Sequence, residues 1–355
     1  MNIFIDNLIF SLQQAGGISV YWSELMKRMN TVSNEHTLTC IETKNSNNIF
    51  TEKINWQQNV IADNSLPLIA KRFLPLLKRL PAKSIFHSSY LRWSNQKNVV
   101  NILTIHDLAP ENGLIKSKGK FIRQWQQHKA LQNADGVLCV SETIKNELLN
   151  YYSFLHPENV KVVYHGVSDL FYTIEKKEQQ EPFVLFVGHR SGYKNFNLAV
   201  EVVSALPNMK LVIVGGKELN TEEELLLNKK LYNRFEFKSI VGVDDLNKLY
   251  NNAFCLLYPS SYEGFGLPIA EAMKVGCPVV TTNMAAIPEI AGMGALQVNE
   301  LEINDFTNAI QSLHHQSIRQ QLIDDGKQQS LNFSWDKCFK ETFNFYEFIL
   351  KKKFG

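Results

Sequence analysis

The sequence predicts an α/β protein of two domains, each a parallel β-sheet covered by helices. Three observations predict this fold. Short apolar segments alternate with amphipathic helical segments along the whole chain. The apolar segments are rich in Val, Ile and Phe and do not alternate with polar residues, which is typical of parallel strands covered on both faces. A length of 355 residues is more than one ordinary core needs and suits two domains.

The first half of the chain carries the pattern of the first domain. Its predicted strands are Asn2–Ile5, Thr37–Ile41, Ser84–His87, Val99–Ile105, Gly136–Val140 and Val160–Tyr164. The helical patterns between them include Ser19–Met29, Lys118–Gln132 and Glu142–Asn150. A charged, polar run from Glu175 to Pro182 then has the composition of a linker. We therefore expect the first domain to cover residues 1–175.

A second series of strands and helices follows this linker. Its predicted strands are Phe183–Val187, Lys210–Val214, Ile240–Val243, Phe254–Tyr258, Pro278–Thr281 and Ala295–Val298. A helical tract from about Trp335 to Lys352 ends the sequence. We expect a second domain at residues 182–334 and a separate C-terminal helix at 335–355. Two βα domains joined by one linker suggest two Rossmann-like βαβ domains facing a central cleft.

Composition and charge exclude several classes of protein. The hydrophobic share of 45% and the charged share of 20% are those of a globular protein, and no apolar run is long enough to span a bilayer. The five scattered cysteines favour neither a disulfide framework nor a zinc site, and no secretory signal is seen, so we expect a reduced, cytoplasmic protein. Residues 1–170 carry 18 Lys and Arg against 13 Asp and Glu, which falls short of a nucleic-acid-binding surface.

The most informative segment is the loop Glu263-Gly-Phe-Gly-Leu-Pro-Ile-Ala-Glu271, which follows a strand and opens a helix. In an open parallel sheet such a loop lies at the carboxyl edge, where ligands bind. The glycines let the backbone approach a ligand, and the helix N-terminus offers N–H groups to a phosphate. We expect Glu263 in the loop and Glu271 in the first helical turn, as acceptors for the vicinal hydroxyls of a ribose or a sugar. The alternative is a helix whose first turn simply favours acids.

Three further turns follow strands of the two domains. Gly188-His-Arg190-Ser-Gly-Tyr-Lys194 leaves the first strand of the second domain, and its two cations can hold a diphosphate leaving group or be solvated surface charges. Gly16-Gly17 can bring backbone N–H groups toward a phosphate, although it is not a Gly-x-Gly-x-x-Gly motif. His106-Asp107 ends a strand of the first domain, as His87 does, and such a histidine is more often structural than catalytic.

These segments together resemble family 4 of the retaining glycosyltransferases, which have the GT-B architecture of two Rossmann-like domains. The resemblance is strongest from Phe183 to Val280 and looser before Val99. The segment from Pro259 to Val279 is its most specific part. Ile85–Tyr90 looks like members that build bacterial surface polysaccharides, and Phe333-Ser334-Trp335 looks like the start of the helix that returns to the first domain.

The resemblance implies a role for each matching residue. Arg190 and Lys194 would bind the donor diphosphate, Glu271 the ribose and Glu263 the transferred sugar. The segment around Val243 would hold the base, and His106 would lie against the sugar. The implied catalytic residues are His106, Glu263, Arg190 and Lys194. The implied donor-binding residues are Gly16, Gly17, Gly188, Arg190, Lys194, Val243, Glu263, Gly264, Phe265, Gly266, Leu267 and Glu271.

The resemblance also implies the reaction and its partners. A hexose, with mannose favoured over glucose, would pass with retained configuration from a UDP- or GDP-sugar to a glycan acceptor, such as a lipid-linked oligosaccharide. No metal or other cofactor is expected, since the sequence has no Asp-x-Asp to hold a divalent cation. Attack by the acceptor hydroxyl from the front face is the expected mechanism. Three rivals remain: a sugar-nucleotide epimerase of the same architecture, an NAD-dependent oxidoreductase and a non-catalytic sugar-binding subunit.

The segment Leu68–Leu80 mixes apolar residues with four cations, Lys71, Arg72, Lys78 and Arg79. A basic amphipathic segment of this kind can contact an anionic membrane that carries a lipid-linked acceptor. Pro75 interrupts the segment, and an ordinary surface helix has the same pattern. The segment therefore predicts either peripheral contact with the inner face of the plasma membrane or an ordinary surface helix.

Overall fold

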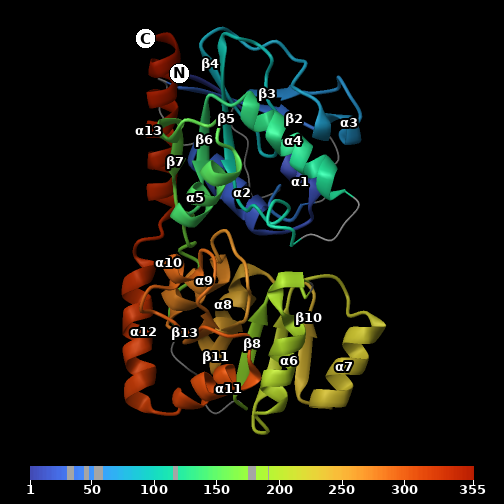
Figure 1. The fold of residues 1–355 in the computed structure, drawn as a ribbon, viewed down its shortest axis with the longest axis vertical. Helices are drawn as coiled ribbons and strands as arrows, with labels where there is room; N and C mark the ends of the chain where they lie inside the picture. The colour runs from blue at the N-terminus through green and yellow to red at the C-terminus, as the bar shows by residue number, and fades with distance from the viewer. Residues whose placement is uncertain (30–35, 44–47, 52–58, 115–118, 175–180, 191) are drawn as a thin grey trace. The chain divides into compact units, whose positions relative to one another are not determined.

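The computed structural model describes residues 1–29, 36–43, 48–51, 59–114, 119–174, 181–190 and 192–355, which form two compact units (Figure 1). Unit 1 comprises residues 1–166 and 335–355, and unit 2 comprises residues 167–334. Each unit is a parallel sheet with helices on its faces, so the predicted α/β class of two Rossmann-like domains is confirmed. Most of the predicted linker at 175–182 lies outside the described residues.

The described part of unit 1 contains a seven-stranded parallel sheet in the order β3-β2-β1-β4-β5-β6-β7. Its strands are β1 (Asn2–Asp6), β2 (Thr37–Glu42), β3 (Asn59–Ala62), β4 (Ser84–His87), β5 (Val99–Ile105), β6 (Gly136–Cys139) and β7 (Val160–Val162). All of the strands predicted for this half are present, and none of their ends differs from the prediction by more than two residues. The edge strand β3 was not predicted because its apolar run, Val60–Ala62, is only three residues long, and in the structure the strand is mostly exposed.

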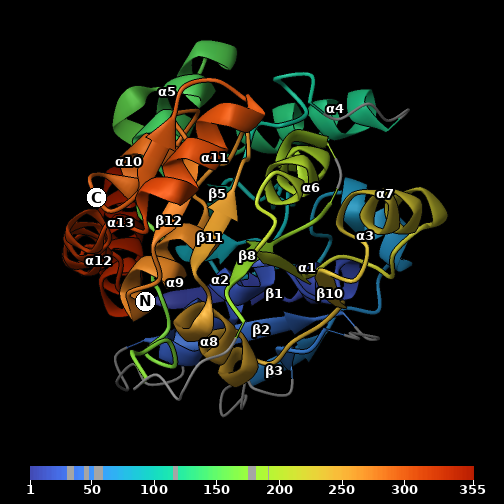
Figure 2. The ribbon, with the colours of Figure 1, turned by 90° about the horizontal axis from the view of Figure 1, so that it is seen from below.

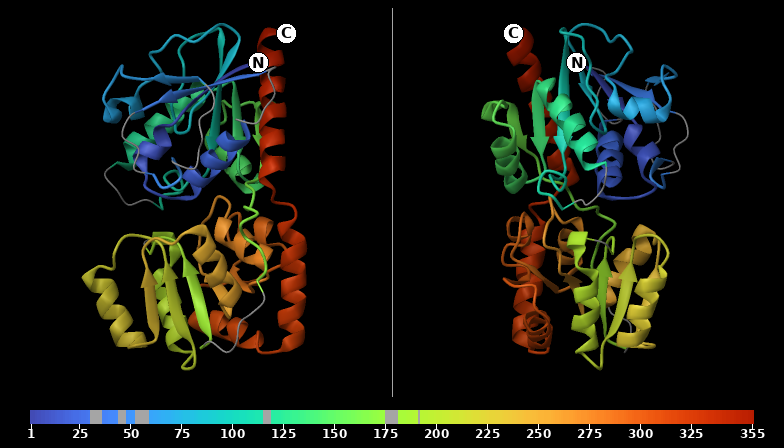
Figure 3. Two further views of the ribbon diagram at one scale, coloured as in Figure 1. Left: turned by 180° about the vertical axis from the view of Figure 1, so that it is seen from behind. Right: turned by 45° about the vertical axis from the view of Figure 1, so that its right-hand side comes forward.

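A helix from the end of the chain completes unit 1. Its helices are α1 (Leu8–Leu12), α2 (Gly17–Met29), α3 (Leu68–Phe73), α4 (Lys120–Gln132), α5 (Glu142–Tyr151) and α13 (Trp335–Phe354). Figure 3 shows α13 running along this unit, where it packs on α2 and on strands β4 and β5. The fit is close at Gly136, because a Cβ atom there would lie 2.9 Å from Phe345 and Ile349 of α13.

The described part of unit 2 contains a six-stranded parallel sheet in the order β10-β9-β8-β11-β12-β13. Its strands are β8 (Phe183–Val187), β9 (Lys210–Val214), β10 (Phe235–Lys238), β11 (Cys255–Tyr258), β12 (Val279–Thr282) and β13 (Leu296–Val298). The prediction of a strand at Ile240–Val243 was wrong: the strand lies at Phe235–Lys238 instead. This edge strand carries Glu236 and Lys238 and is only half-buried, so it lacks the apolar run that marks the central strands.

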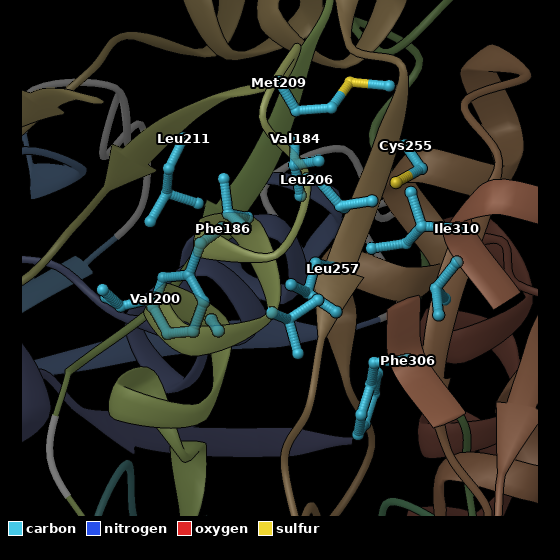
Figure 4. Packing of buried hydrophobic residues seen from close by; sticks show 14 of the residues in the cluster. Val184, Phe186, Val200, Leu206, Met209, Leu211, Cys255, Leu257, Phe306 and Ile310 are labelled. Carbon is cyan, nitrogen blue, oxygen red and sulfur yellow. The ribbon is translucent and has the colours of Figure 1, made fainter. Parts of the chain in front are cut away.

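The helices of unit 2 cover both faces of its sheet. They are α6 (Phe196–Ser204), α7 (Thr221–Leu231), α8 (Val243–Asn252), α9 (Leu267–Val275), α10 (Ile287–Ala291), α11 (Ile303–Ser312) and α12 (Gln316–Ser330). Helices α6 and α11 lie on one face, and α8 and α9 lie on the other (Figure 2). On the first face, Phe186 and Leu257 of the sheet pack in one cluster with Val200 of α6 and Phe306 and Ile310 of α11 (Figure 4).

The boundary between the units lies before the predicted linker. Residues 167–174 cluster with unit 2, whereas the sequence placed them in the first domain. Their backbone is held by helix α8: Tyr172 N donates to Asn247 Oδ1 at 3.2 Å and Ile174 N donates to Asn251 Oδ1 at 2.8 Å. Contacts made by two buried asparagines across some 75 positions cannot be seen in a local pattern.

The predicted amphipathic segment Leu68–Leu80 is different in the structure. Helix α3 covers only its first six residues, because Pro75 follows closely. Lys71 is buried and its Nζ lies 3.7 Å from Asp63 Oδ2, so Lys71 cannot belong to a surface charge patch. Arg72 lies over the ring of Tyr90, while Arg79 is exposed. The expectation of four surface cations was therefore wrong for Lys71.

We expect Phe345→Ala to destabilise the protein by about 3–5 kcal/mol, because it empties a buried site between α13 and the sheet. Phe345 is 2% exposed and Phe348, on the same helix, is 48% exposed. Phe348→Ala is the matched control and should change stability by less than about 0.5 kcal/mol. Urea unfolding of both variants checks the expectation, and equal effects would show that α13 does not support the core of unit 1.

Candidate active site

An ion pair joins the turns after two neighbouring strands of unit 2. Lys194 ends a short 3₁₀ helix, Gly192–Lys194, that follows β8, and Glu263 lies in the loop after β11. Lys194 Nζ lies 2.5 Å from Glu263 Oε1 and donates to Tyr258 Oη at 2.9 Å. Both side chains are largely buried, so this charge-assisted hydrogen bond is stronger than a pair on an open surface. The structure thus brings together two of the predicted site residues from positions 69 apart.

Helix α9 presents its N-terminus at the same loop. Gly266 is its N-cap with φ of +92°, a conformation that a side chain would strain, and Pro268 stands in its first turn. No side chain of the described residues caps this end, and its first turn holds no acid. The uncapped N–H groups and the helix dipole favour an anion here. The Phe265 ring turns into the core against Phe333, with ring centroids 5.3 Å apart.

Glu271 stands in the second turn of α9, so the prediction of a first-turn position was wrong. The helix begins at Leu267, and Pro268 and the left-handed Gly266 fix that start. Glu271 Oε2 accepts a hydrogen bond from Tyr250 Oη of α8 at 2.9 Å. Burial raises the pKa of the Glu271 carboxyl to about 7, although the hydrogen bond from Tyr250 acts in the opposite direction. A carboxylate placed in this way is not explained as a first-turn helix cap.

Arg190 is not part of the ion pair between Lys194 and Glu263. Its guanidinium folds over the turn after β9, donating to Gly215 O at 2.8 Å and Lys217 O at 2.6 Å. Its Nε lies 3.0 Å from Glu223 Oε1 of α7. The nearby Gly188 has φ of +142°, and its N–H donates to Val214 O at 2.9 Å. In this conformation the backbone carbonyls and Glu223 use the hydrogen-bonding groups that a phosphate would need.

The predicted glycine turn of unit 1 leads directly into α2. Gly17 is the first residue of α2, and Gly16 O accepts from Val20 N at 3.0 Å and from Ser19 Oγ at 2.9 Å. A Cβ atom on Gly16 would meet only the end of the Gln13 side chain, which can move away, so the space at this turn does not by itself require glycine. The first turn of α2 contains no acid, which leaves its N-terminus favourable for an anion.

His106 follows β5 and lies in an aromatic cluster of unit 1. Tyr21 of α2 contacts it edge-on at 5.0 Å, and the His165 ring lies 5.4 Å away. Both ring nitrogens of His106 are covered, and neither has a hydrogen-bond partner among the described residues. Burial lowers the pKa of His106 to about 3, so its imidazole is neutral at physiological pH. A neutral imidazole can donate one hydrogen bond and accept another.

His87, which the sequence placed like His106, has a structural role in this conformation. Its Nδ1 is 2.6 Å from Tyr346 Oη of α13, and its Nε2 is 2.9 Å from Thr104 Oγ1. Burial lowers the pKa of His87 to about 3, with a smaller contribution from His106. Both ring nitrogens are therefore used inside unit 1.

Several residues around the site were not predicted from the sequence. Tyr258 accepts a hydrogen bond from Lys194, and Tyr250 donates one to Glu271. Tyr21 packs edge-on against the ring of His106. Tyr258 ends β11 immediately before the loop, so its position at the carboxyl edge was visible in the sequence. Tyr250 and Tyr21 stand on helices, and only the packing of those helices shows which face they use. Val243, predicted near the base, is the first residue of α8.

Comparison with known proteins places this chain in a family. Residues 15–169 match the family model described as Glycosyltransferase Family 4, and residues 169–329 match the model described as Glycosyl transferases group 1. Two Rossmann-like units of this kind are the architecture of the GT-B class of glycosyltransferases. The chain belongs to glycosyltransferase family 4.

Curated relatives include two O-antigen chain mannosyltransferases. The chain is 28% identical to O-antigen chain mannosyltransferase B of Escherichia coli over 62% of this chain and 63% of the relative. It is 28% identical to the O-antigen chain mannosyltransferase RfbU of Salmonella typhimurium over 59% of this chain and 60% of the relative. The matches thus span less than two thirds of the length of either relative.

Solved structures share the fold at low identity. A sucrose-phosphate synthase from Thermosynechococcus elongatus superposes with a TM-score of 0.78 at 18% identity, covering 99% of this chain and all of that one. Anabaena HepE in complex with UDP and glucose superposes with a TM-score of 0.73 at 16% identity, covering 97% of this chain and 98% of that one. These likenesses confirm the GT-B fold.

We expect Glu271→Gln to stabilise the protein at neutral pH. Because the folded-state pKa of about 7 lies above the ordinary value of 4.5, the folded protein binds the proton more tightly than the unfolded chain. The wild type should therefore lose stability as the pH rises from about 5 to 7, by roughly 1–3 kcal/mol relative to the variant. Unfolding midpoints between pH 5 and 8 measure this, with the exposed Glu300→Gln as control. Parallel pH curves for wild type and Glu271→Gln would contradict the expectation.

Proposed function

We propose that this glycosyltransferase transfers a hexose, with retention of configuration and without a metal, from a UDP- or GDP-sugar to a glycan acceptor. The observation that carries this proposal is the Lys194–Glu263 pair beside the uncapped N-terminus of α9. A cation and a helix N-terminus suit a diphosphate, and a carboxylate suits sugar hydroxyls. All three stand at the carboxyl edge of one parallel sheet, where α/β proteins bind nucleotides.

The donor is assigned to groups along this edge of unit 2. Glu271 accepts from the ribose hydroxyls, and Glu263 accepts from hydroxyls of the transferred sugar. The backbone from Gly264 to Leu267 approaches the sugar and the phosphates. Ribose binding requires the ionised form of Glu271, so the bound nucleotide lowers the raised pKa of this carboxyl. The segment beginning at Val243 lies beside the base.

Lys194 and the α9 N-terminus stabilise the departing diphosphate. The bond from the anomeric carbon to the diphosphate oxygen breaks, and the acceptor oxygen bonds to the anomeric carbon on the same face. The proton of the acceptor hydroxyl passes to the leaving phosphate oxygen. Positive charge at the leaving group acts mainly as the bond breaks, which is where it accelerates the reaction. Arg190 adds a second cation when its guanidinium leaves Glu223 and binds the phosphate instead.

His106 acts as a hydrogen-bonding group rather than as an acid. Its neutral ring has two nitrogens without partners in the described part of unit 1, and both are covered in this conformation. The ring or its neighbours therefore move before either nitrogen binds a hydroxyl of the transferred sugar. The N–H groups at the Gly16-Gly17 turn donate further hydrogen bonds to the phosphates.

The acceptor proposed is a lipid-linked glycan of bacterial surface polysaccharide synthesis, and the proposed hexose is mannose. The names of the two O-antigen mannosyltransferases support both assignments. An epimerase of the same architecture would release an altered sugar nucleotide without an acceptor. A non-catalytic subunit would bind the donor without turnover.

Glu263→Gln should lower kcat/KM about 10–100-fold, since a hydrogen bond to a charged group is lost while the neutral amide keeps the shape. Lys194→Met should lower kcat/KM about 10²–10³-fold, because the leaving diphosphate loses a stabilising positive charge. Nucleotide release from UDP- and GDP-mannose and -glucose, with acceptor glycan, measures both variants, and Glu300→Gln is the charge-matched control. Thermal shift with the same donors identifies the base that binds.

The proposal has three separate ways to fail. If the Glu263→Gln variant is as active as the wild type, the site assignment is wrong. An inverted linkage in the product would remove the retaining mechanism. Donor conversion without an acceptor would favour the epimerase.

We further propose peripheral contact of unit 1 with anionic lipid. Ile69, Leu74 and Leu77 are exposed along the segment that also carries Lys78 and Arg79. Apolar side chains flanked by cations suit the surface of an anionic bilayer. Among the described helices, none has the length and apolarity needed to cross a bilayer.

Reversal of two charges, Lys78→Glu with Arg79→Glu, should weaken binding to vesicles with phosphatidylserine at least tenfold, given about 1 kcal/mol for each cation. Lys71 is left unchanged because it is buried against Asp63. The control is Lys229→Glu with Lys248→Glu in unit 2. Sedimentation with vesicles measures the effect, and equal sedimentation of both double variants would contradict this contact.

A further inference from the structure

A cavity of unit 1 is formed by the segment that follows β5 and by two helices. It has a volume of about 350 Å³ and is lined by Glu111, Gln124, Trp125, His128, Tyr151 and Tyr152. Trp125 belongs to α4 and Tyr151 to α5, while Glu111 stands five positions after His106. The cavity therefore shares a chain segment with the predicted sugar-facing histidine, and none of its lining residues belongs to the donor site.

Two large aromatic side chains of this cavity are half-exposed. Trp125 is 51% exposed and Tyr151 is 49% exposed, and the ring of His128 packs beneath on Phe154 at 5.2 Å. Tyr151 is fixed in place, because its Oη donates to Asn112 Oδ1 at 2.7 Å. Rigid aromatic rings at a cavity mouth offer an apolar face with polar groups at the edge. The C–H face of a pyranose is a chemical match for such a ring.

The polar group at the cavity is a carboxylate with one unused oxygen. Glu111 Oε1 accepts from Tyr152 Oη at 2.8 Å, whereas Oε2 is covered and has no hydrogen-bond partner among the described residues. A covered acceptor without a donor costs free energy, so a ligand hydroxyl that donates to it is favoured. Burial, with a smaller contribution from Asp107, raises the pKa of this carboxyl.

The loop that carries Glu111 is held firmly. Asp107 Oδ1 accepts from Ala109 N at 3.1 Å, Asn112 N donates to Leu108 O at 2.9 Å and Leu114 N donates to Ala109 O at 3.0 Å. Gln124 Nε2 of α4 donates to Pro110 O at 2.9 Å. The position of the Glu111 carboxyl is therefore set before any ligand arrives, which lowers the entropic cost of binding.

The charge of the lining indicates which ligands fit. The set contains one carboxylate and neither lysine nor arginine. Arg123 acts on the Glu111 carboxyl from outside the lining and lies 3.7 Å from Asp107, so its charge is already shared between two carboxylates. A phosphate or a lipid headgroup would therefore meet a net negative charge at this cavity. A neutral polyhydroxylated ligand meets two aromatic faces and an acceptor, which is the usual mixture of apolar walls and few polar groups in a small-molecule site.

We propose that this cavity is a subsite for a neutral pyranose of the acceptor glycan, stacked on Trp125 and Tyr151 with a hydroxyl donating to Glu111. The inference rests on the proposed function, because it assumes a glycan acceptor. It assigns recognition to a sugar of the acceptor chain rather than to its lipid or its phosphate.

The test is binding of free oligosaccharides without lipid or phosphate. Saturation-transfer NMR and calorimetry with mannotriose, maltotriose, galactobiose and chitotriose are carried out on the whole protein. We expect at least one of them to bind the wild type, with affinity at least tenfold weaker in Trp125→Ala and several-fold weaker in Glu111→Gln. Phe121→Ala is the matched control: it stands on the same helix, is 77% exposed and does not line the cavity, so its affinity should equal that of the wild type.

Nucleotide binding separates this inference from the proposed function. Each nucleotide should bind the wild type and the three variants with the same affinity, because none of the three substituted residues is assigned to the donor site. Failure of all four oligosaccharides to bind the wild type, or equal affinity in the wild type and Trp125→Ala, overturns the subsite while leaving the donor site intact. Loss of nucleotide binding in the wild type itself would overturn the proposed function instead.

Discussion

The candidate donor site depends on the parallel pairing of β8 with β11. These strands are neighbours in the sheet although about 70 residues separate them, and Leu185 pairs with Leu256. The strand order reverses here: β9 and β10 lie beyond β8, and β12 and β13 lie beyond β11. Consequently the loops after β8 and β11 leave toward opposite faces and open a crevice between them. The ion pair between Lys194 and Glu263 joins these two loops.

Unit 1 has the same reversal between β1 and β4, but its own side chains fill that position. Asp6 at the end of β1 accepts from Ser88 Oγ at 2.8 Å and from Ser89 N at 2.9 Å, just after β4. Arg92 Nη1 lies 4.0 Å from Asp6 and 3.2 Å from Asp63, all fully buried. A buried carboxylate must be paired in this way to be tolerated. The two units therefore use one topology differently, with a closed polar network in one and an open edge in the other.

The central strands and the edge groups of the site could be predicted from the sequence because both depend on local pattern. Val99–Ile105 is an apolar run buried on both faces, and a turn after such a strand must reach the carboxyl edge. The rest depended on long-range contacts. Arg190 pairs with Glu223, and residues 167–174 join unit 2 through Asn247 and Asn251. Strand β10 was missed because an edge strand needs no apolar run. Glu271 was misplaced by one turn because the helix already begins at Leu267, directly after Gly266.

Because helix α13 belongs to unit 1 but comes last in the sequence, unit 1 cannot be completed until the whole chain has been synthesised. Unit 1 contains residues 1–166 and also 335–355, so the ribosome makes all of unit 2 before the last helix of unit 1 exists. Until then, the groove beside Gly136 lacks Phe345 and Ile349, and His87 lacks Tyr346. Domains ordinarily fold in the order in which they emerge. Here the first unit to begin is the last to be completed, and its exposed apolar groove must be kept from other chains while translation continues.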